Sequence, residues 1–250
     1  MNSISNWKKW GKQDPYYGVL SEEKYRTRRM REKDLEGFFK TGESFVQDTE
    51  KKISKLFGLS LTGCSILDFG CGVGRLAIPF ARFSANQVVG LDVSPEVIDI
   101  ARSHIPSMEV KNLDFMVFDG QNLPELPQFD FINSYIVFQH IETSLGYTLL
   151  HQLLGKLKPG GIIQVHITYG HSLPKLSYWN FFLRGKLPLY NFLYSFLKNR
   201  NVNAEPIMQM NHYSPQKLFG IFSKHSNNIQ VELTNHGGHL GAIYLLRKEF

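Results

Sequence analysis

The stretch "ILDFGCGVGRLAIPFA", residues 66–81, decides the fold. It begins as a short apolar run, continues through glycines at Gly70, Gly72 and Gly74, and ends in a run with helical character. Glycine lets the backbone adopt left-handed angles and approach a ligand closely. The helix that follows such a turn directs free N–H groups at the same point. The stretch therefore predicts a strand, a ligand-binding turn and a helix.

The spacing of the turn differs from that of a dinucleotide-binding turn. A dinucleotide fingerprint has glycine at its first, third and sixth positions. Here the fifth position is Gly74 and the sixth is Arg75, and Asp68 precedes the first glycine by two residues. A carboxylate at that strand end suits a ligand with a positive ammonium group better than one with a pyrophosphate.

The chain on both sides of this stretch alternates between strand and helix patterns. The pattern predicts parallel strands with helices on both faces. Ser94 and Pro95 begin one helix, a leucine-rich face from about Ser144 marks another, and "KPGG" at 158–161 predicts the turn before the fifth strand. The predicted strands are "SILDFG" (65–70), "QVVGLDV" (87–93), "DFMVFD" (114–119), a segment of "FDFINSYIVF" (129–138) and "IIQVHI" (162–167).

The last third of the chain has a different pattern. Residues 171–211 are rich in aromatic side chains and lack a clean strand pattern. The insertion predicts a helical cap over a pocket, with a dimer contact or a membrane-facing surface as alternatives. After a helix start at Ser214 and Pro215, "IQVELT" (229–234) and "AIYLLR" (242–247) flank a glycine-rich connection and predict a hairpin.

Composition is that of a folded protein with a basic excess. The 250 residues carry a net charge of +6, and residues 1–40 hold ten Lys/Arg against six Asp/Glu. The basic segment 24–33 fits a solvated helix face, or an arm that attracts an anionic substrate or membrane surface. No apolar run predicts a transmembrane helix and the N-terminus lacks a secretory signal pattern. With only Cys64 and Cys71, a cytoplasmic protein is expected.

Five motifs in order carry a resemblance to a known family. "LDFGCGVG" (67–74), "VVGLDVS" (88–94), "FMVFDGQNLP" (115–124), "FDFINSYIVFQHI" (129–141) and "LLGKLKPGGIIQVHI" (153–167) occur at the expected spacing. Together they resemble class I S-adenosylmethionine-dependent methyltransferases over about residues 44–168. The resemblance implies an α/β fold with a seven-stranded, mostly parallel Rossmann-like sheet. A terminal antiparallel hairpin and a helical aromatic insertion after strand five complete the expected fold.

The expected organisation has four parts. They are an N-terminal arm or lid (1–43), a cofactor-binding core (44–170), an aromatic cap (171–211) and the end of the core (212–250). A monomer or homodimer is expected.

The resemblance also implies a cofactor site for S-adenosylmethionine, with S-adenosylhomocysteine as the product. Asp92 would hold the ribose hydroxyls, and Asp119 would accept from the adenine amino group beside Gly120 and Gln121. Asp119 is preferred to Asp114 because ligands bind at the carboxyl ends of the strands in open α/β sheets. Aromatic residues of the arm would form a lid, with Lys24 or Arg26 reaching the cofactor carboxylate. The full expected set is Asp68, Gly70, Cys71, Gly72, Gly74, Asp92, Val93, Asp119, Gly120, Gln121, Tyr135, Tyr16 and Arg26.

Two features that the sequence lacks limit the classes of methyl acceptor. The fourth strand ends in "NSYI" (133–136), without the prolines that enzymes methylating exocyclic amino groups of nucleic acids would need, and no cysteine lies near the fourth or fifth strand. A hydroxyl or amine of a small metabolite or glycan is therefore expected, with no DNA and no metal. An RNA or protein acceptor, or a non-catalytic cofactor-binding module, is the alternative.

Histidines and aromatic residues supply the candidates for acceptor chemistry. His140 follows the fourth strand and is the candidate general base, with packing or helix capping as the alternative role. His166 lies inside a strand and is expected in the core. The expected acceptor pocket consists of Tyr17, His171, Trp179, His212 and Tyr213.

Overall fold

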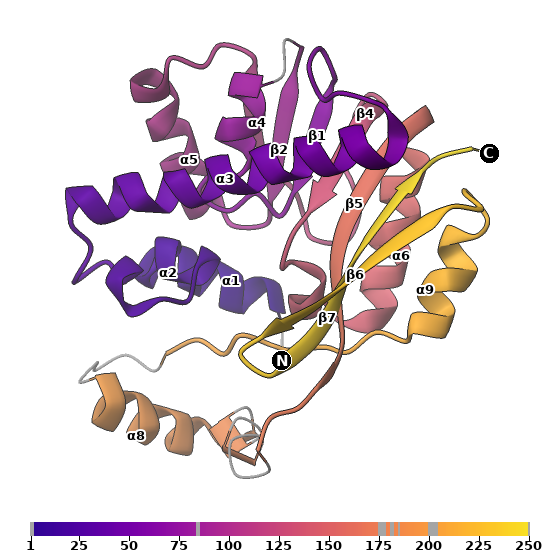
Figure 1. The fold of residues 1–250 in the computed structure, drawn as a ribbon. Coiled ribbons are helices and arrows are strands. Elements are labelled where there is room, and N and C mark those ends of the chain that lie inside the picture. Colours follow the sequence, from indigo (N-terminus) through magenta and orange to yellow (C-terminus); the bar gives the residue numbers. More distant parts are fainter. Residues whose placement is uncertain are drawn as a thin grey trace.

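The computed structural model describes residues 3–83, 86–174, 179–180, 183–184, 186–199 and 205–249. Its centre is a seven-stranded sheet in the order β3-β2-β1-β4-β5-β7-β6 (Figure 1). The strands are β1 (Ile66–Phe69), β2 (Val88–Asp92), β3 (Leu113–Val117), β4 (Phe129–Ser134), β5 (Leu157–His171), β6 (Ile229–His236) and β7 (His239–Arg247).

Strands β1 to β5 are mutually parallel, and β7 pairs antiparallel with both β5 and β6. The expected seven-stranded sheet with a terminal antiparallel hairpin is confirmed. One boundary was wrong: the fifth strand begins at Leu157, before the expected turn, because Leu157 already pairs with Phe129. The register then shifts before Phe131 pairs with Ile162, so the "KPGG" segment lies within the irregular start of β5.

Helices surround the sheet and also form the N-terminal arm. They are α1 (Ser3–Gln13), α2 (Pro15–Val19), α3 (Glu32–Phe57), α4 (Ala77–Phe83), α5 (Pro95–Met108), α6 (Thr143–Gly155), α8 (Pro188–Asn199) and α9 (Pro215–Phe222), with short 3-10 turns η1 (Glu23–Tyr25) and η2 (Phe138–His140). Helix α3 runs without interruption through residue 43, where the arm was expected to end.

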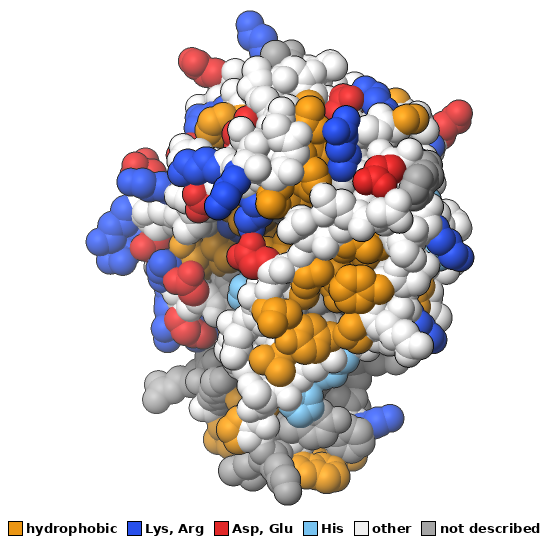
Figure 2. Space-filling view, turned by 45° about the vertical axis from the view of Figure 1, so that its right-hand side comes forward, with side chains coloured by type: hydrophobic (Ala, Val, Ile, Leu, Met, Phe, Trp, Pro, Cys, Tyr) orange, Lys and Arg blue, Asp and Glu red, His pale blue; other side chains and the backbone are white. Residues whose placement is uncertain are grey.

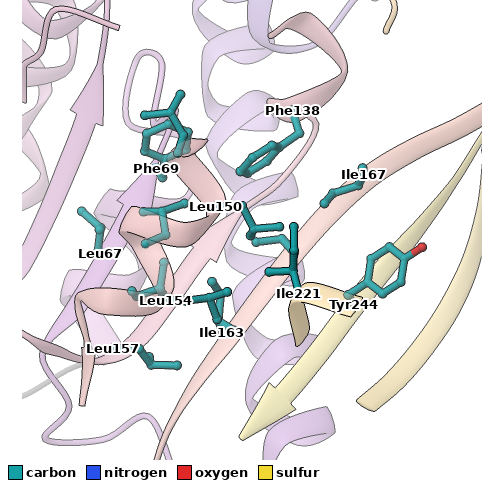
Figure 3. Packing of buried hydrophobic residues seen from close by; sticks show 14 of the residues in the cluster. Leu67, Phe69, Phe138, Leu150, Leu154, Leu157, Ile163, Ile167, Ile221 and Tyr244 are labelled. Atoms are coloured by element: carbon teal, nitrogen blue, oxygen red, sulfur yellow. The ribbon is translucent and has the colours of Figure 1, made fainter. Parts of the chain in front are cut away.

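The alternation of side chains along the strands produces two apolar layers. Leu67 and Phe69 of β1 face a cluster that includes leucines of α6 and Ile221 of α9 (Figure 3). Ile66 points to the opposite face and joins a cluster with residues of α3, α4 and α5. Burial of both layers is the main stabilising contribution to this sheet, and it fixes the register of each strand.

The carboxyl ends of β1, β2 and β4 meet at one edge of the sheet, and α1 and α2 lie below that edge (Figure 1). Among the described residues, no helix is both long and apolar enough to cross a membrane. Helix α8 lies apart from the sheet, at the lower end of the molecule (Figure 1).

Candidate active site

The glycine turn after β1 adopts the conformation that its sequence predicts. Gly70, Gly72 and Gly74 have φ angles of 77°, 54° and 85°, in the left-handed region that favours glycine. The N–H groups of Gly70 and Cys71 both donate to the Leu91 carbonyl, which ties the turn to the end of β2. A Cβ on Gly72 would lie 2.6 Å from Cγ2 of Val19, so the arm packs directly against the turn.

Asp68 is a buried carboxylate at the end of β1. Its Oδ1 accepts a hydrogen bond from Asn133 Nδ2 at 2.7 Å, and its Oδ2 has no hydrogen-bond partner among the described residues. Burial raises the pKa of Asp68 to about 6, although the Asn133 hydrogen bond and the nearby Arg75 favour the ionised form. A buried oxygen without a partner is costly, so this oxygen is suited to a ligand that donates hydrogen bonds or carries positive charge.

Asp92, at the end of β2, connects the turn to helix α5. Its Oδ2 accepts from the Gly72 N–H and its Oδ1 from the Ser94 N–H, both at 3.0 Å. Burial raises the pKa of Asp92, while these backbone donors favour the carboxylate. Each oxygen retains a lone pair for a further donor such as a ligand hydroxyl.

Asp119 occupies a different environment. Its side chain is exposed, and Oδ1 accepts from the N–H groups of Gln121 at 2.7 Å and Asn122 at 2.8 Å. These backbone donors lower the pKa of Asp119. Gly120, with a φ of 82°, lines the cavity described below, whereas the side chains of Asp119 and Gln121 do not.

A cavity of about 510 Å³ opens beside these groups. That volume lies within the range of small-molecule and cofactor pockets. Its walls come from the turn and strand ends on one side and from α1 and α2 of the arm on the other. The expected residues on its wall are Asp68, Gly70, Cys71, Gly72, Asp92, Val93, Gly120, Tyr135 and His140.

The N-terminal arm contributes two tryptophan side chains to the cavity wall. Trp7 and Trp10 of α1 are on the cavity wall, and Trp10 is almost fully buried. Ile4 packs against Gly120, where a Cβ would lie 2.6 Å from Cδ1 of Ile4. The arm thus forms part of the cavity wall and packs against both the glycine turn and Gly120.

His140 faces the cavity from η2. Its Nδ1 lies 2.7 Å from the Gln209 carbonyl oxygen, which can only accept, so Nδ1 carries the proton. Its Nε2 is then the acceptor and lies 3.1 Å from Nε2 of Gln139. Burial lowers the pKa of His140 to about 4, so the ring is neutral near pH 7. The Trp7 ring meets the imidazole edge at a centroid distance of 4.8 Å.

Three expected arm residues lie off the cavity wall. The Arg26 guanidinium is buried and ion-paired with Asp14 at 3.0 Å and Glu205 at 2.6 Å, and it lies 3.8 Å above the Tyr17 ring. Tyr16 is hydrogen-bonded to His104 at 2.8 Å. The structure therefore gives Arg26 protein carboxylates as partners, where the sequence predicted a cofactor carboxylate.

The expected acceptor residues do not come together around the cavity. Tyr213 is buried, and its hydroxyl lies 3.0 Å from the Phe138 carbonyl and 2.9 Å from the Ile141 carbonyl, where it supports η2 from behind. His171 and His212 are exposed, with ring centroids 5.4 Å apart. Trp179 is 57% exposed. None of these four side chains is on the cavity wall.

Sequence reasoning missed other residues that line the cavity wall or support it. Asn133 orients Asp68, and its polarity inside an apolar strand was a usable signal. Gln209 and Asn211, at the end of the insertion, contribute to the wall although nothing in their local sequence marks them. Phe118, Ile141, Leu145 and Leu149 give part of the cavity wall an apolar surface.

Comparison with known proteins agrees with this geometry. Residues 66–161 match the model of the family described as "Methyltransferase domain". The magnesium-protoporphyrin O-methyltransferase of Rhodobacter capsulatus is 42% identical over 72 residues, which cover 29% of this chain and 31% of that protein. The chain thus matches about a third of the length of that relative.

Solved structures share the fold over nearly the whole chain. Magnesium protoporphyrin IX methyltransferase from Synechocystis PCC 6803 with bound SAM has a TM-score of 0.61 at 14% identity and covers 99% of this chain and 98% of its own. The N-methyltransferase NodS from Bradyrhizobium japonicum WM9 has a TM-score of 0.61 at 11% identity, with 99% of each chain covered. Residues 66–161 thus match a methyltransferase domain, and these likenesses show that the chain has the fold of class I S-adenosylmethionine-dependent methyltransferases.

Proposed function

We propose that this chain transfers a methyl group from S-adenosylmethionine to a hydroxyl or amine of a small molecule. The observation that carries the proposal is the buried Oδ2 of Asp68, which has no hydrogen-bond partner in the part of the chain that the structure describes and lies on the wall of a cavity bounded by the glycine turn. The cofactor has an ammonium group and a ribose diol, and the two carboxylates at the ends of β1 and β2 fit these groups.

The residues that would hold the cofactor follow from their chemistry. Asp68 would accept from its amino group and Asp92 from its ribose hydroxyls, while the backbone of 70–74 and of Gly120 would allow close approach. When bound, the cofactor supplies an electrophilic methyl group on a positively charged sulfur. The arm excludes water from that region through Trp7 and Trp10.

His140 is the proposed general base for a hydroxyl acceptor. Its Nδ1–H is held by the Gln209 carbonyl, so the lone pair on Nε2 is the site that takes a proton. The Gln139 amide donates to that lone pair, and this amide must turn aside for an acceptor hydroxyl to reach it. A neutral amine acceptor has less need of this base.

The cavity favours a small acceptor with an apolar body. Ile141, Leu145 and Leu149 give the cavity wall an apolar part, and Trp7 and Trp10 of the arm add aromatic rings to it. The name of one similar protein, a magnesium-protoporphyrin O-methyltransferase, supports a small molecule as the acceptor, and that of the N-methyltransferase NodS supports transfer to an amine. A sugar ring or another metabolite with one flat face also fits this lining.

We also propose that the parts of the chain divide these tasks. The core 44–170 and the end 212–250 would hold the cofactor, and the arm 1–43 would close over it. The 171–211 insertion would contribute to the acceptor side through Gln209 and Asn211.

Calorimetry with S-adenosylhomocysteine tests the cofactor assignment. The wild type should bind at micromolar concentration, and Asp68→Asn and Asp92→Ala should each weaken binding by at least about tenfold, equivalent to the loss of one charged hydrogen bond. Asp114→Ala, an exposed carboxylate on β3, is the matched control and should bind like the wild type. No binding by the wild type, or unchanged binding by Asp92→Ala, would refute the assignment.

Turnover needs a second assay. Acceptor extracts incubated with methyl-labelled cofactor should release S-adenosylhomocysteine and label a small molecule. Label found only in RNA or protein would contradict the small-molecule assignment. Cofactor binding without turnover in any extract would instead favour a non-catalytic module.

A further inference from the structure

Helix α8, in the insertion, exposes an apolar stripe. Five large side chains remain between 39% and 79% exposed, and they occur at spacings of three and four residues, which places them on one helical face. They are Leu189, Phe192, Leu193, Phe196 and Leu197. Several exposed apolar side chains in one stripe differ from the scattered apolar residues of an ordinary surface.

The opposite face of α8 is polar and buried. Asn191 and Ser195 are only 7% and 0% exposed. Asn191 donates to the Glu205 carbonyl at 2.9 Å, and Ser195 Oγ accepts from the Glu205 N–H at 3.1 Å. Arg184 donates to the Asn191 side-chain oxygen at 2.9 Å. These bonds hold the helix with its apolar side outward, the reverse of a helix that covers a core.

The charge of this segment identifies the kind of surface it fits. Residues 172–204 include no Asp or Glu and carry Lys175, Arg184, Lys186, Lys198 and Arg200. Trp179 and Leu187, just before α8, are 57% and 51% exposed. At the lower end of the molecule, where α8 lies, Figure 2 shows hydrophobic side chains at the surface. An apolar helical stripe with basic residues and an exposed tryptophan is the pattern of a helix that lies in a membrane interface.

We propose that α8 inserts its apolar stripe into the interface of an anionic lipid bilayer. Charge favours this occupant over a second copy of the chain. Lys175, Lys186, Lys198 and Arg200 add positive charge beyond the ion pair of Arg184 with Glu205, so a symmetric dimer through α8 would place two segments of net positive charge against each other, which is repulsive. An anionic headgroup layer instead attracts them, and the acyl region removes the five apolar side chains from water.

Vesicle flotation with the full chain tests the proposal. Vesicles of phosphatidylcholine with phosphatidylglycerol at a ratio of about 3:1 should carry the wild type, and pure phosphatidylcholine vesicles should carry much less. The double variant Leu193→Glu/Leu197→Glu should reduce the partition coefficient by about tenfold or more, because it places two carboxylates in the stripe. Leu233→Glu is the matched control: it is 72% exposed on β6, outside the stripe, and should bind like the wild type.

The expected result has three parts: binding to anionic vesicles, loss in the double variant and retention in Leu233→Glu. Equal binding by the double variant and the wild type would overturn the proposal. A wild type that ignores both vesicle types but is dimeric by light scattering, and becomes monomeric in the double variant, would identify a second copy as the occupant instead. Circular dichroism melting checks the fold, and Leu197→Glu alone, at a side chain that is 79% exposed, repeats the test if the double variant is unstable.

Discussion

The guanidinium of Arg26 donates to the Glu205 carboxylate across 2.6 Å and joins the N-terminal arm to the residues that follow α8. The two residues are 179 positions apart in the chain. Asp14 adds a second carboxylate at 3.0 Å, and Arg184 binds Glu205 at 3.3 Å. This buried ionic cluster ties together the two variable segments of the protein.

Arg26→Met should destabilise the protein by about 3 kcal/mol, because it leaves buried carboxylates without their cation. Urea unfolding measures this loss, and limited proteolysis should cut the arm faster. Arg29→Met removes an exposed partner of Glu23 and should cost less than about 1 kcal/mol. Equal stability of the two variants would contradict the role assigned to the cluster.

Two glycines of α3 should respond oppositely to alanine. A Cβ on Gly42 would overlap the carbonyl oxygen of Arg75, next to the ligand-binding turn, whereas a Cβ on Gly37 would meet nothing within 4 Å. Gly42→Ala should therefore lower stability by about 1–3 kcal/mol. Gly37→Ala should raise it by about 0.5–1 kcal/mol, through helix propensity. Thermal melting of both variants checks the sign of each effect.

Cofactor affinity should decrease below pH 6. The pKa of Asp68 is raised to about 6 by burial, so its carboxyl group is ionised at pH 8 and mostly protonated at pH 5. A ligand with an ammonium group binds the ionised form, and binding at pH 5 must first release a proton. The dissociation constant of S-adenosylhomocysteine should therefore rise about tenfold between pH 8 and pH 5, as calorimetry can measure.

Asp68→Asn is the control for this pH dependence. Its affinity should be lower at pH 8 and nearly constant down to pH 5. Ionisation of Asp68 favours cofactor binding but disfavours folding, because the pKa of Asp68 in the folded protein lies above its pKa in the unfolded chain. The contribution of Asp68 to the free energy of unfolding decreases as the pH rises from about 4 to about 6. Melting of Asp68→Asn should lack that decrease, and an unchanged pH profile would exclude Asp68 as its origin.

His140→Ala should reduce turnover by about 10²–10⁴-fold for a hydroxyl acceptor and leave cofactor affinity within a few fold. With a pKa lowered to about 4 by burial, the imidazole stays neutral through the physiological range, so kcat should show no titration near pH 6.5 from this residue. Initial rates of methyl transfer at pH 5–9 measure the pH dependence of kcat. Equal losses of turnover and affinity would indicate a packing role.

Tyr213→Phe tests the support behind His140. Removing the hydroxyl leaves the Phe138 and Ile141 carbonyls without that donor, and stability should decrease by about 1–2 kcal/mol. Tyr244→Phe, which removes the hydroxyl from another buried ring, is the comparison in the same urea titration. A Tyr213→Phe variant as stable as Tyr244→Phe would show that these bonds do not hold η2.

The sequence by itself determined the parallel core and the ligand-binding turn. Apolar strands, glycine spacing and helix starts are local signals, so the positions of Asp68, Gly72 and Asp92 followed from their places at strand ends. The carboxyl ends of neighbouring parallel strands meet at one edge, and the fold places these residues together there. The start of β5 was misjudged because pairing with β4 overrode a local turn signal.

Only the tertiary structure decided which variable residues reach the cavity. Arg26 pairs with Glu205, Tyr213 supports η2 from the core, and Gln209 and Asn211 join the wall, through contacts between segments far apart in the sequence. The outward direction of the apolar side of α8 is likewise set by the buried bonds of Asn191 and Ser195. Composition shows that a segment is apolar, but only its packing decides which face water meets.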